Sequence, residues 1–420
     1  MAAGHASDID ARSTGRGWVV VGALFLMLGI VITARNSLGL LMPFLKDDLG
    51  WSYGLVSSAG AVMLTTMAVV APLAGMMLDR HGPRLVYALG MSLAAIAFAL
   101  SASMSEPWQL VLFYGIVGGV GFAAISPSLV STTVASRFDR GLGLATGVAT
   151  SGSTAGQLAL MPLLAVLIGA FGWRSSLWIA AASIVATAIA VHLLIGARER
   201  PRGPARTGSD RRSRAGFRVV LSGLARQRTF WLLAGGFAIC GFTTAGVIKI
   251  HLIPYAVACG FPPLESATAY GVMSAFSLAG MIAFGHLSDR FHRPALLASI
   301  YFMRALTFLV LVQIAGSSTL LFAFAVLFGI FDYATFPIVA SLVASHIGRH
   351  IMGFTMGLIF AAHSLGGAAG TFLGGYLFEL FARYDWVWFV SFGLALLAAA
   401  LTVLVRENRG GSPAPAPAGA

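Results

Sequence analysis

Twelve apolar runs, each long enough to cross a lipid bilayer as a helix, dominate this chain. A helix needs ~20 apolar residues to cross the hydrocarbon layer. Lipid offers no hydrogen-bonding partners to the backbone, so each run must pair its own peptide groups within a helix. We therefore predict an all-α membrane protein with twelve transmembrane helices. The predicted segments lie near residues 18–43, 52–78, 84–104, 108–133, 141–170, 173–196, 230–257, 266–288, 294–315, 318–345, 352–379 and 386–405.

Composition and charge agree with a membrane location. Only 10% of the residues are charged and 58% are hydrophobic, whereas a soluble domain carries about 25% charge. The net charge of +12 would suggest nucleic acid in a soluble protein. Here the Lys and Arg residues gather in loops and tails on one side of the predicted membrane, which the positive-inside rule assigns to the cytoplasm. We expect a multi-pass protein of the plasma (cytoplasmic) membrane, with both termini cytoplasmic and no nucleic-acid partner.

A second feature of the sequence is an internal repeat with an offset of 210 positions. The stretch that begins at Gly75 with Gly-Met-Met-Leu-Asp-Arg has a counterpart that begins at Gly285 with Gly-His-Leu-Ser-Asp-Arg. The same offset relates Pro127 to Pro337. Parallel repeats of this kind are typical of secondary transporters. We predict two pseudo-symmetric six-helix bundles.

The domain boundaries follow from these patterns. The segment between the halves holds ten Arg, no Lys and two Pro residues, and we interpret it as a solvated linker near anionic lipid headgroups. The Gly/Pro/Ala-rich C-terminal segment is predicted to be disordered. The predicted parts are a cytoplasmic tail (1–17), an N-terminal bundle (18–196), an Arg-rich cytoplasmic linker (197–229), a C-terminal bundle (230–405) and a second cytoplasmic tail (406–420).

The two repeated charged loops are candidates for a cytoplasmic gate. Glycine lets a neighbouring helix approach, an aspartate suits a helix N-terminus, and arginines can bridge to acidic groups on adjoining helices. Such contacts can hold one side closed in one state and break in the other. Anchoring by positive charge would explain the arginines but not the recurrence of the aspartate. The candidate gate residues are Gly75, Asp79, Arg80, Arg84, Gly285, Asp289 and Arg290.

The pattern Gly-x-x-x-Asp-Arg-x-Gly-x-Arg from Gly75, with its degraded copy from Gly285, resembles the major facilitator superfamily over all twelve segments. The stretches Arg35-Asn-Ser-Leu-Gly-Leu-Leu-Met-Pro and Arg140-Gly-Leu-Gly-Leu-Ala-Thr-Gly resemble its monocarboxylate-porter branch. This resemblance implies alternating access and proton-coupled movement of a carboxylate. It also implies that segments one, four, seven and ten line a central cavity.

The chain departs from that branch in one important place. Monocarboxylate porters place an arginine in segment eight, whereas residues 268–280 carry no charge here. The Gly-Pro pair typical of antiporters is also absent from segment five. A symporter of a small organic anion remains the favoured prediction. A proton-coupled antiporter that exports drugs or metabolites is the alternative, and a membrane receptor that transports nothing is a further one.

Two cations inside predicted spans indicate the charge of the substrate. A charge within the membrane is costly and is by default a functional candidate. Arg35 lies in segment one, and Lys249 lies in segment seven, one helical turn from the equivalent position. Two cations that face one cavity repel each other unless an anion lies between them. We expect Arg35 to bind a carboxylate and Lys249 to add positive potential, although each side chain can instead extend to the outer surface.

Proton coupling has two candidates. Asp332 is the one acid that we place inside a span, and an isolated acid in an apolar site favours its protonated form, as a proton carrier requires. Alternatively, Arg304 of segment nine neutralises it in a structural pair. His363 is the second candidate carrier because histidine titrates near neutral pH, although it can also serve only in packing.

Polar residues at other positions in the spans can complete the cavity by hydrogen bonding. The candidates for substrate contact are Asn36, Tyr114, Gln157 and Tyr333, with Tyr270 as a further polar residue. We find no nucleophile elbow, phosphate loop or metal-ligand pattern, and therefore expect neither enzyme activity, a metal nor a cofactor. The expected partners are a small anionic substrate, protons and the lipid bilayer, and a monomer is the default.

Overall fold

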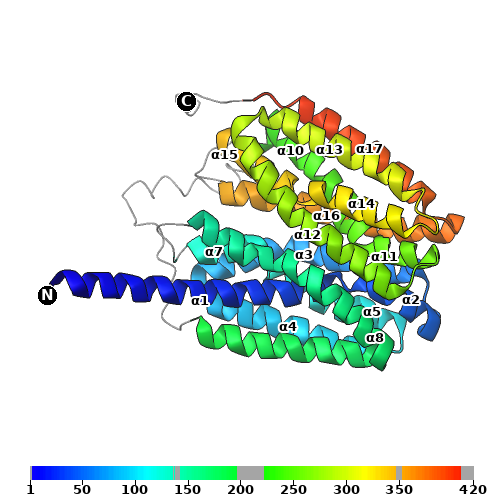
Figure 1. Cartoon of the computed structure of the whole chain (residues 1–420), viewed down its shortest axis with the longest axis horizontal. Coiled ribbons are helices and arrows are strands. Elements are labelled where there is room, and N and C mark those ends of the chain that lie inside the picture. The colour runs from blue at the N-terminus through cyan, green and yellow to red at the C-terminus, as the bar shows by residue number, and fades with distance from the viewer. Residues whose placement is uncertain (1, 136, 138–141, 196–221, 347–351, 408–420) are drawn as a thin grey trace.

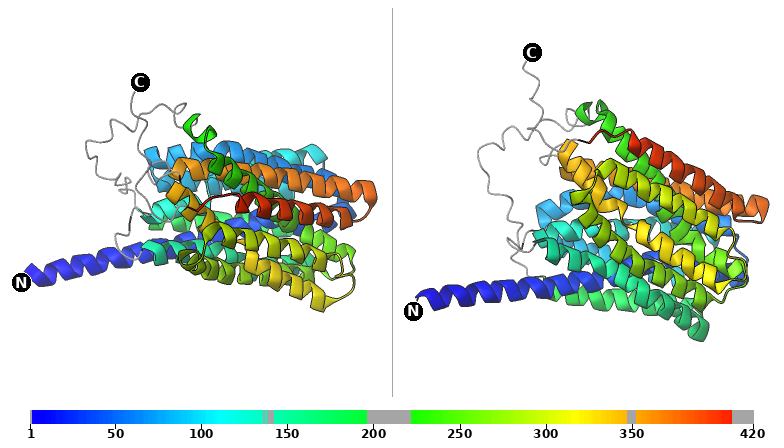
Figure 2. Two further views of the ribbon diagram at one scale, coloured as in Figure 1. Left: turned by 90° about the horizontal axis from the view of Figure 1, so that it is seen from above. Right: turned by 45° about the horizontal axis from the view of Figure 1, so that its top comes forward.

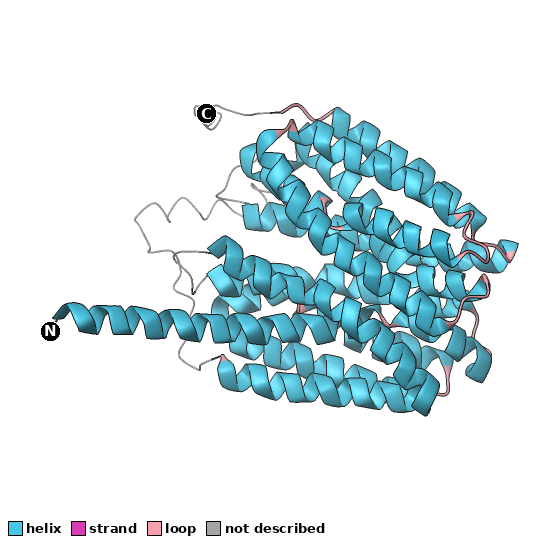
Figure 3. Cartoon of the chain, viewed as in Figure 1, coloured by secondary structure: helices cyan, strands magenta, loops and turns pink. Residues whose placement is uncertain are grey.

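The computed structural model describes residues 2–135, 137, 142–195, 222–346 and 352–407. These residues form helices joined by short loops (Figure 3). Ten of the described helices are long and apolar enough to cross a membrane. One of them contains the non-helical residue Gly172 (φ 79°), which divides it into the predicted fifth and sixth segments. The fourth segment is present in shorter pieces between residues 107 and 135, so the layout agrees with the predicted twelve segments.

The first span of the N-terminal half is broken, and its first part packs mainly against α8 (Leu142–Leu194). Two helices separated at Ser37 form this span, and α1 begins inside the segment that we expected to be a tail (Figure 1). The helices are α1 (Ala2–Asn36), α2 (Leu38–Leu49), α3 (Tyr53–His81), α4 (Pro83–Ala102), α5 (Pro107–Leu110), η1 (Val111–Gly118), α6 (Gly119–Ala123), α7 (Pro127–Ala135) and α8 (Leu142–Leu194).

The second half repeats this plan. Residues 196–221 of the expected linker lie outside the described residues, and residues 222–225 form a helical turn before the seventh span begins at Arg228. The helices are α10 (Arg228–Gly241), η3 (Phe242–Ile248), α11 (Lys249–Ala258), α12 (Pro263–Arg290), α13 (Arg293–Leu311), α14 (Ser318–Asp332), α15 (Thr335–His346), α16 (Met352–Phe381) and α17 (Asp385–Val403). Residues 408–420 lie outside the described residues.

Close helix contacts recur at the offset of the sequence repeat. A Cβ atom on Gly119 would lie 3.0 Å from the carbonyl oxygen of Met63, and one on Gly329 would lie 2.5 Å from that of Met273. These two contacts are related residue by residue by 210 positions. Small residues let membrane helices approach closely, so the repeat specifies how the helices pack as well as the order in which they occur.

The fourth and tenth spans break at equivalent places. Helix α6 ends at Ala123 and α7 begins at Pro127, while α14 ends at Asp332 and α15 begins two residues before Pro337. Proline lacks the N–H that would continue the helical ladder. In the tenth span the N–H of Phe336 bonds to the carbonyl of Tyr333, three residues earlier. The break therefore leaves carbonyl groups exposed at the C-terminal end of α14.

The two halves pack against each other at the end of the bundle opposite the start of α1 and the end of α17, which we call the distal end (Figures 1 and 2). There a Cβ on Gly39 of α2 would lie 2.4 Å from the carbonyl oxygen of Ile250 of α11. The N–H of Gly54 in α3 also donates to Glu379 of α16 at 2.9 Å. Near the other end, Gly75 and Gly357 have no neighbouring atom within 4 Å of an added Cβ. The described contacts between the halves thus lie toward the distal end.

Candidate functional site

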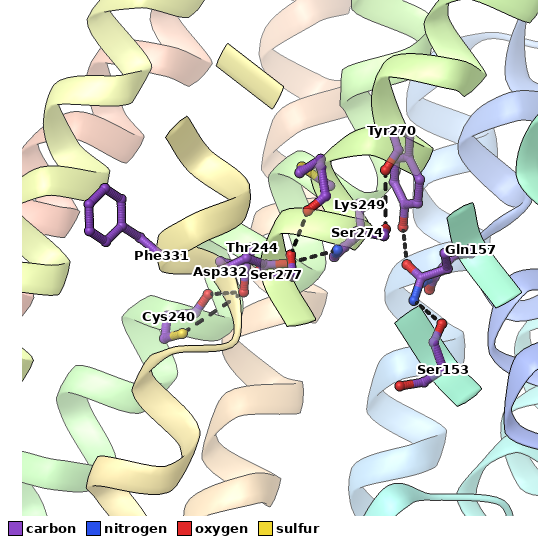
Figure 4. Close-up of polar contacts among 12 residues, drawn as sticks. Ser153, Gln157, Cys240, Thr244, Lys249, Tyr270, Ser274, Ser277, Phe331 and Asp332 are labelled. Carbon is purple, nitrogen blue, oxygen red and sulfur yellow. Dashed lines mark hydrogen bonds and ion pairs between the residues drawn. The ribbon is translucent and has the colours of Figure 1, made fainter. Parts of the chain in front are cut away.

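A buried ion pair lies at the centre of the C-terminal half. The Nζ atom of Lys249 is 2.8 Å from Oδ2 of Asp332, and the two side chains are 6% and 3% exposed (Figure 4). The Ser277 hydroxyl of α12 donates to the same oxygen at 3.2 Å. Three spans therefore meet at one carboxylate. Asp332 neutralises Lys249, so the repulsion that we expected between Lys249 and Arg35 does not build up.

Local irregularities in two helices bring the pair together. Lys249 is the first residue of α11 and follows η3, a π-helical segment. Such segments shift the direction of the following side chains and frequently occur at functional sites. Asp332 is the last residue of α14, directly before the break in the tenth span. The side chains that meet are thus positioned by departures from regular α-helix.

Two tyrosine rings cover the ammonium group of Lys249. Nζ lies 5.1 Å from the ring centre of Tyr270 and 5.3 Å from that of Tyr333. Aromatic faces attract a cation, and the attraction grows when water is excluded. Tyr333, a predicted substrate contact, therefore lies beside the ion pair.

Arg304 lies within the same region but does not meet the carboxylate of Asp332. It is 0% exposed, and its Nη2 atom donates to the main-chain carbonyls of Phe331 and Asp332, the latter at 2.8 Å. Its Nη1 atom donates to Sγ of Cys240 at 3.0 Å. Arg304 and Asp332 are therefore in contact through the main chain, because the helix break exposes carbonyls that a cation can cap.

A hydrogen-bond cluster joins the two halves beside the ion pair. Oε1 of Gln157 in α8 accepts a hydrogen bond from Nδ2 of Asn36 at 3.1 Å. It accepts a second one from the hydroxyl of Tyr270 at 3.0 Å (Figure 4). Nε2 of Gln157 donates to the carbonyl of Ser153 at 2.7 Å. Gln157 and Tyr270 are 0% exposed and Asn36 is 5% exposed. The structure thus brings together two of the predicted substrate contacts, Asn36 and Gln157, with Tyr270.

Arg35 lies at the end of α1, next to this cluster. Its Nε atom is 3.4 Å from Oδ1 of Asn36, and its main-chain carbonyl accepts a hydrogen bond from the hydroxyl of Tyr114. Among the described residues no carboxylate forms an ion pair with Arg35. Tyr114, a predicted substrate contact, supports the backbone of Arg35.

His363 lies on α16, where its side chain faces Cys240, the residue that Arg304 also contacts. Its ring centre is 4.9 Å from that of Phe237 and 6.2 Å from that of Phe360. These aromatic contacts agree with the packing role that we considered for it, and they leave its role as a proton carrier untested.

The candidate gate is described only in part, because the side chains of Asp79, Arg80 and Asp289 lie outside the described residues. Arg84 places Nη2 2.8 Å from Nε2 of His192, within its own half. Arg290 is exposed. In the part of the chain that the structure describes, no three His, Cys, Asp or Glu side chains gather as a metal site would require.

Sequence reasoning missed two members of the site, Ser277 and Cys240. Both are small residues within apolar helices, where serine and cysteine usually only pack or satisfy neighbouring helices. A charge at Asp332 or Arg304 signals that some partner exists, but it does not reveal which small polar group will face it.

Solved structures share this fold. The bacterial homologue of the human lysosomal transporter Spinster, in its inward-facing and unoccupied conformation, superposes with a TM-score of 0.74 at 18% identity, over 93% of this chain and 96% of that one. A mutant of the nucleoside transporter NupG gives a TM-score of 0.74 at 13% identity, over 91% of this chain and 98% of that one.

Sequence comparison finds relatives along most of the chain. An uncharacterized MFS-type transporter, YcxA of Bacillus subtilis (strain 168), is 27% identical over 87% of this chain and 90% of its own. Human monocarboxylate transporter 11 is 29% identical over 86% of this chain and 77% of its own. The family model for the Major Facilitator Superfamily matches residues 24–371 and, in a second match, 276–420. The chain is therefore a multi-pass membrane transporter, not an enzyme, and belongs to the major facilitator superfamily.

Proposed function

We propose that this protein is a proton-coupled symporter of a small organic anion, specifically a monocarboxylate. The observation that supports this function most strongly is the buried Lys249–Asp332 pair, with its 2.8 Å contact. The distant relatives that are named monocarboxylate transporters support the same substrate class.

The coupling follows from the cost of an unpaired charge in a dry site. Removal of one partner from a buried ion pair leaves an uncompensated charge and costs about 3–5 kcal/mol. A proton that neutralises Asp332 would leave Lys249 without a partner, and an anion that approaches Lys249 would compete with Asp332. The two ligands together leave every charge compensated, so proton and anion bind as a pair.

Arg35 supplies the second positive group of the site. No ion pair engages its guanidinium among the described residues, and it contacts Asn36 of the cluster between the halves. A carboxylate is the planar anion that a guanidinium binds best. We assign substrate contact to Arg35, Asn36, Tyr114, Lys249 and Tyr333, and proton transfer to Asp332, with His363 as the alternative. Gln157 belongs to the same site through its hydrogen bonds with Asn36 and Tyr270.

The packing of the halves at the distal end suggests which side is closed. If both termini are cytoplasmic, the described contacts at Gly39 and Gly54 close the outer side. Movement of one half against the other would then break these contacts and close the side that carries the charged loops.

The test is uptake into proteoliposomes that contain the purified protein. An inward proton gradient and a panel of labelled acids (acetate, lactate, pyruvate and benzoate) should give uptake that disappears when the gradient is collapsed. Lys249→Met should abolish the uptake, and Asp48→Asn, which breaks the exposed Arg174–Asp48 pair, is the matched control. Proton-driven efflux of amphipathic cations without uptake of any acid would favour an exporter instead.

A further inference from the structure

One oxygen atom in the structure receives hydrogen bonds from both halves of the molecule. Asn36 Nδ2 approaches Gln157 Oε1 from α1, and the Tyr270 hydroxyl approaches it from α12 of the other half. All three side chains are buried. Two donors fixed on separate bundles therefore converge on a single acceptor that a flexible side chain supplies.

The orientation of the amide is fixed by its neighbours. Gln157 Nε2 donates to the carbonyl of Ser153 at 2.7 Å, so its oxygen must face the two donors. The oxygen of the Asn36 amide is turned toward Nε of Arg35, which leaves the NH2 group of Asn36 directed at Gln157. The bonding network therefore settles which atom of each amide donates and which accepts.

This geometry would suit a carboxylate as well as an amide. A carboxylate oxygen is a planar acceptor like an amide oxygen, and hydrogen bonds to an ionised acceptor are roughly twice as strong. Arg35 lies beside one donor and Lys249 lies 5.1 Å from the ring of the other, so the surroundings also favour an anion.

We propose that Oε1 of Gln157 holds the place of one oxygen of the substrate carboxylate, which displaces the Gln157 amide when it binds. This inference rests on the proposed function and adds a specific role for Gln157, that of an internal competitor. Because the donors belong to different halves, a carboxylate in this position would link the halves as the Gln157 amide does in this structure.

Two substitutions should act in opposite directions. Gln157→Ala removes the competitor, and we expect the apparent KM of the best transported acid of the panel to fall about fivefold, the equivalent of one hydrogen bond. Gln157→Glu places a permanent carboxylate before the same donors, and we expect the KM to rise more than about tenfold. Gln313→Glu, which changes an exposed glutamine in the same way, should leave KM unchanged. A rise in KM in both Gln157 variants would overturn the inference, because Gln157 would then be a direct ligand or a purely structural residue.

A binding measurement separates this inference from the proposed function. The thermal unfolding temperature of detergent-purified protein is measured in sodium benzoate and in sodium chloride at equal concentration. Benzoate should stabilise Gln157→Ala more than wild type, and should not stabilise Gln157→Glu. If the wild-type protein takes up no acid, the proposed function is refuted. A benzoate-specific rise in the unfolding temperature of Gln157→Ala would still support binding of a carboxylate at the place of Gln157 Oε1. Equal responses of Gln157→Ala and Gln157→Glu to benzoate would refute that position whatever the uptake.

Discussion

The two halves of the molecule share a backbone plan but carry different chemistry. The position equivalent to Lys249 in the first half is Gly39, and the position equivalent to Asp332 is Phe122. Gly39 has no room for a side chain, because a Cβ there would lie 2.4 Å from the carbonyl oxygen of Ile250 in the other half. Equivalent positions of the repeat therefore have different roles: Gly39 allows close contact between helices, whereas Lys249 carries a buried charge.

The two halves also contribute different functional groups to the candidate site. The C-terminal half holds the ion pair Lys249–Asp332 and the capping Arg304. The N-terminal half contributes Arg35 and the Gln157 amide. In our proposal, the Lys249–Asp332 pair and the anion-binding Arg35 therefore move relative to each other when the halves move.

The largest expected effect comes from removal of one charge of the C-terminal pair. Lys249→Met leaves Asp332 buried without its cation and should lower the free energy of unfolding by about 3–5 kcal/mol. The double variant Lys249→Met/Asp332→Asn should regain most of that stability but no proton-driven uptake. Thermal unfolding and uptake measure the two effects separately. Equal stability of the single and the double variant would show that the pair is not energetically coupled.

The next effect concerns Arg304, which has no counterpart in the first half. Arg304→Gln removes donors from the carbonyls of Phe331 and Asp332 and should cost about 2 kcal/mol of stability. The maximal uptake rate should also fall, because Asp332 is no longer held in place. Arg304→Lys keeps the charge and should recover part of both quantities. If Arg304→Gln lowers stability but leaves the pH profile of uptake unchanged, Arg304 supports the fold without positioning Asp332.

A smaller loss of stability, similar in both halves, is expected when a glycine at a close helix contact is replaced by alanine. Gly156 and Gly366 are related by the repeat, and an added Cβ would lie 2.3 Å and 1.9 Å from the carbonyl oxygens of Gly29 and Ala238. Gly156→Ala and Gly366→Ala should each cost about 1–3 kcal/mol through overpacking. Gly147→Ala, where the Cβ meets no neighbouring atom within 4 Å, is the matched control. A loss in only one of the two variants would show that the halves pack differently.

The smallest effect is expected at the exposed pair of the first half. Arg174 lies 2.6 Å from Asp48, and both side chains are about half exposed, at 45% and 49%. Exposed ion pairs contribute little to stability because water and salt screen them, so Asp48→Asn should leave thermal unfolding nearly unchanged. Uptake in proteoliposomes should also be retained. A loss of uptake would place Asp48, at the distal end of α2, in the transport cycle.

Much of the fold could be predicted because its signals are local. Apolar length defines the spans, and the repeat of Gly75 at Gly285 defines the two halves. Lys249 and Asp332 could be identified as functional candidates because an isolated charge in a membrane requires a partner.

The pairing of these residues could not be predicted from the sequence. It depends on the π-helical segment before Lys249 and on the break after Asp332, which together bring the two side chains face to face. One of our two alternatives for Asp332 paired its carboxylate with Arg304, whereas in the structure Arg304 donates to main-chain carbonyls at the break. The contact between Gln157 and Tyr270 joins residues 113 positions apart, across the two halves, and no local pattern records it.

The most direct test of the central claim compares exchange with net uptake in Asp332→Asn. The neutral amide imitates the protonated acid, so Lys249 stays available to an anion but no proton can be released. We predict that proteoliposomes with Asp332→Asn still exchange labelled acid for unlabelled acid across the membrane, while uptake driven by a proton gradient is lost. Retention of gradient-driven uptake at the wild-type level in Asp332→Asn would contradict the account, since the proton would then travel through a group other than the Lys249–Asp332 pair.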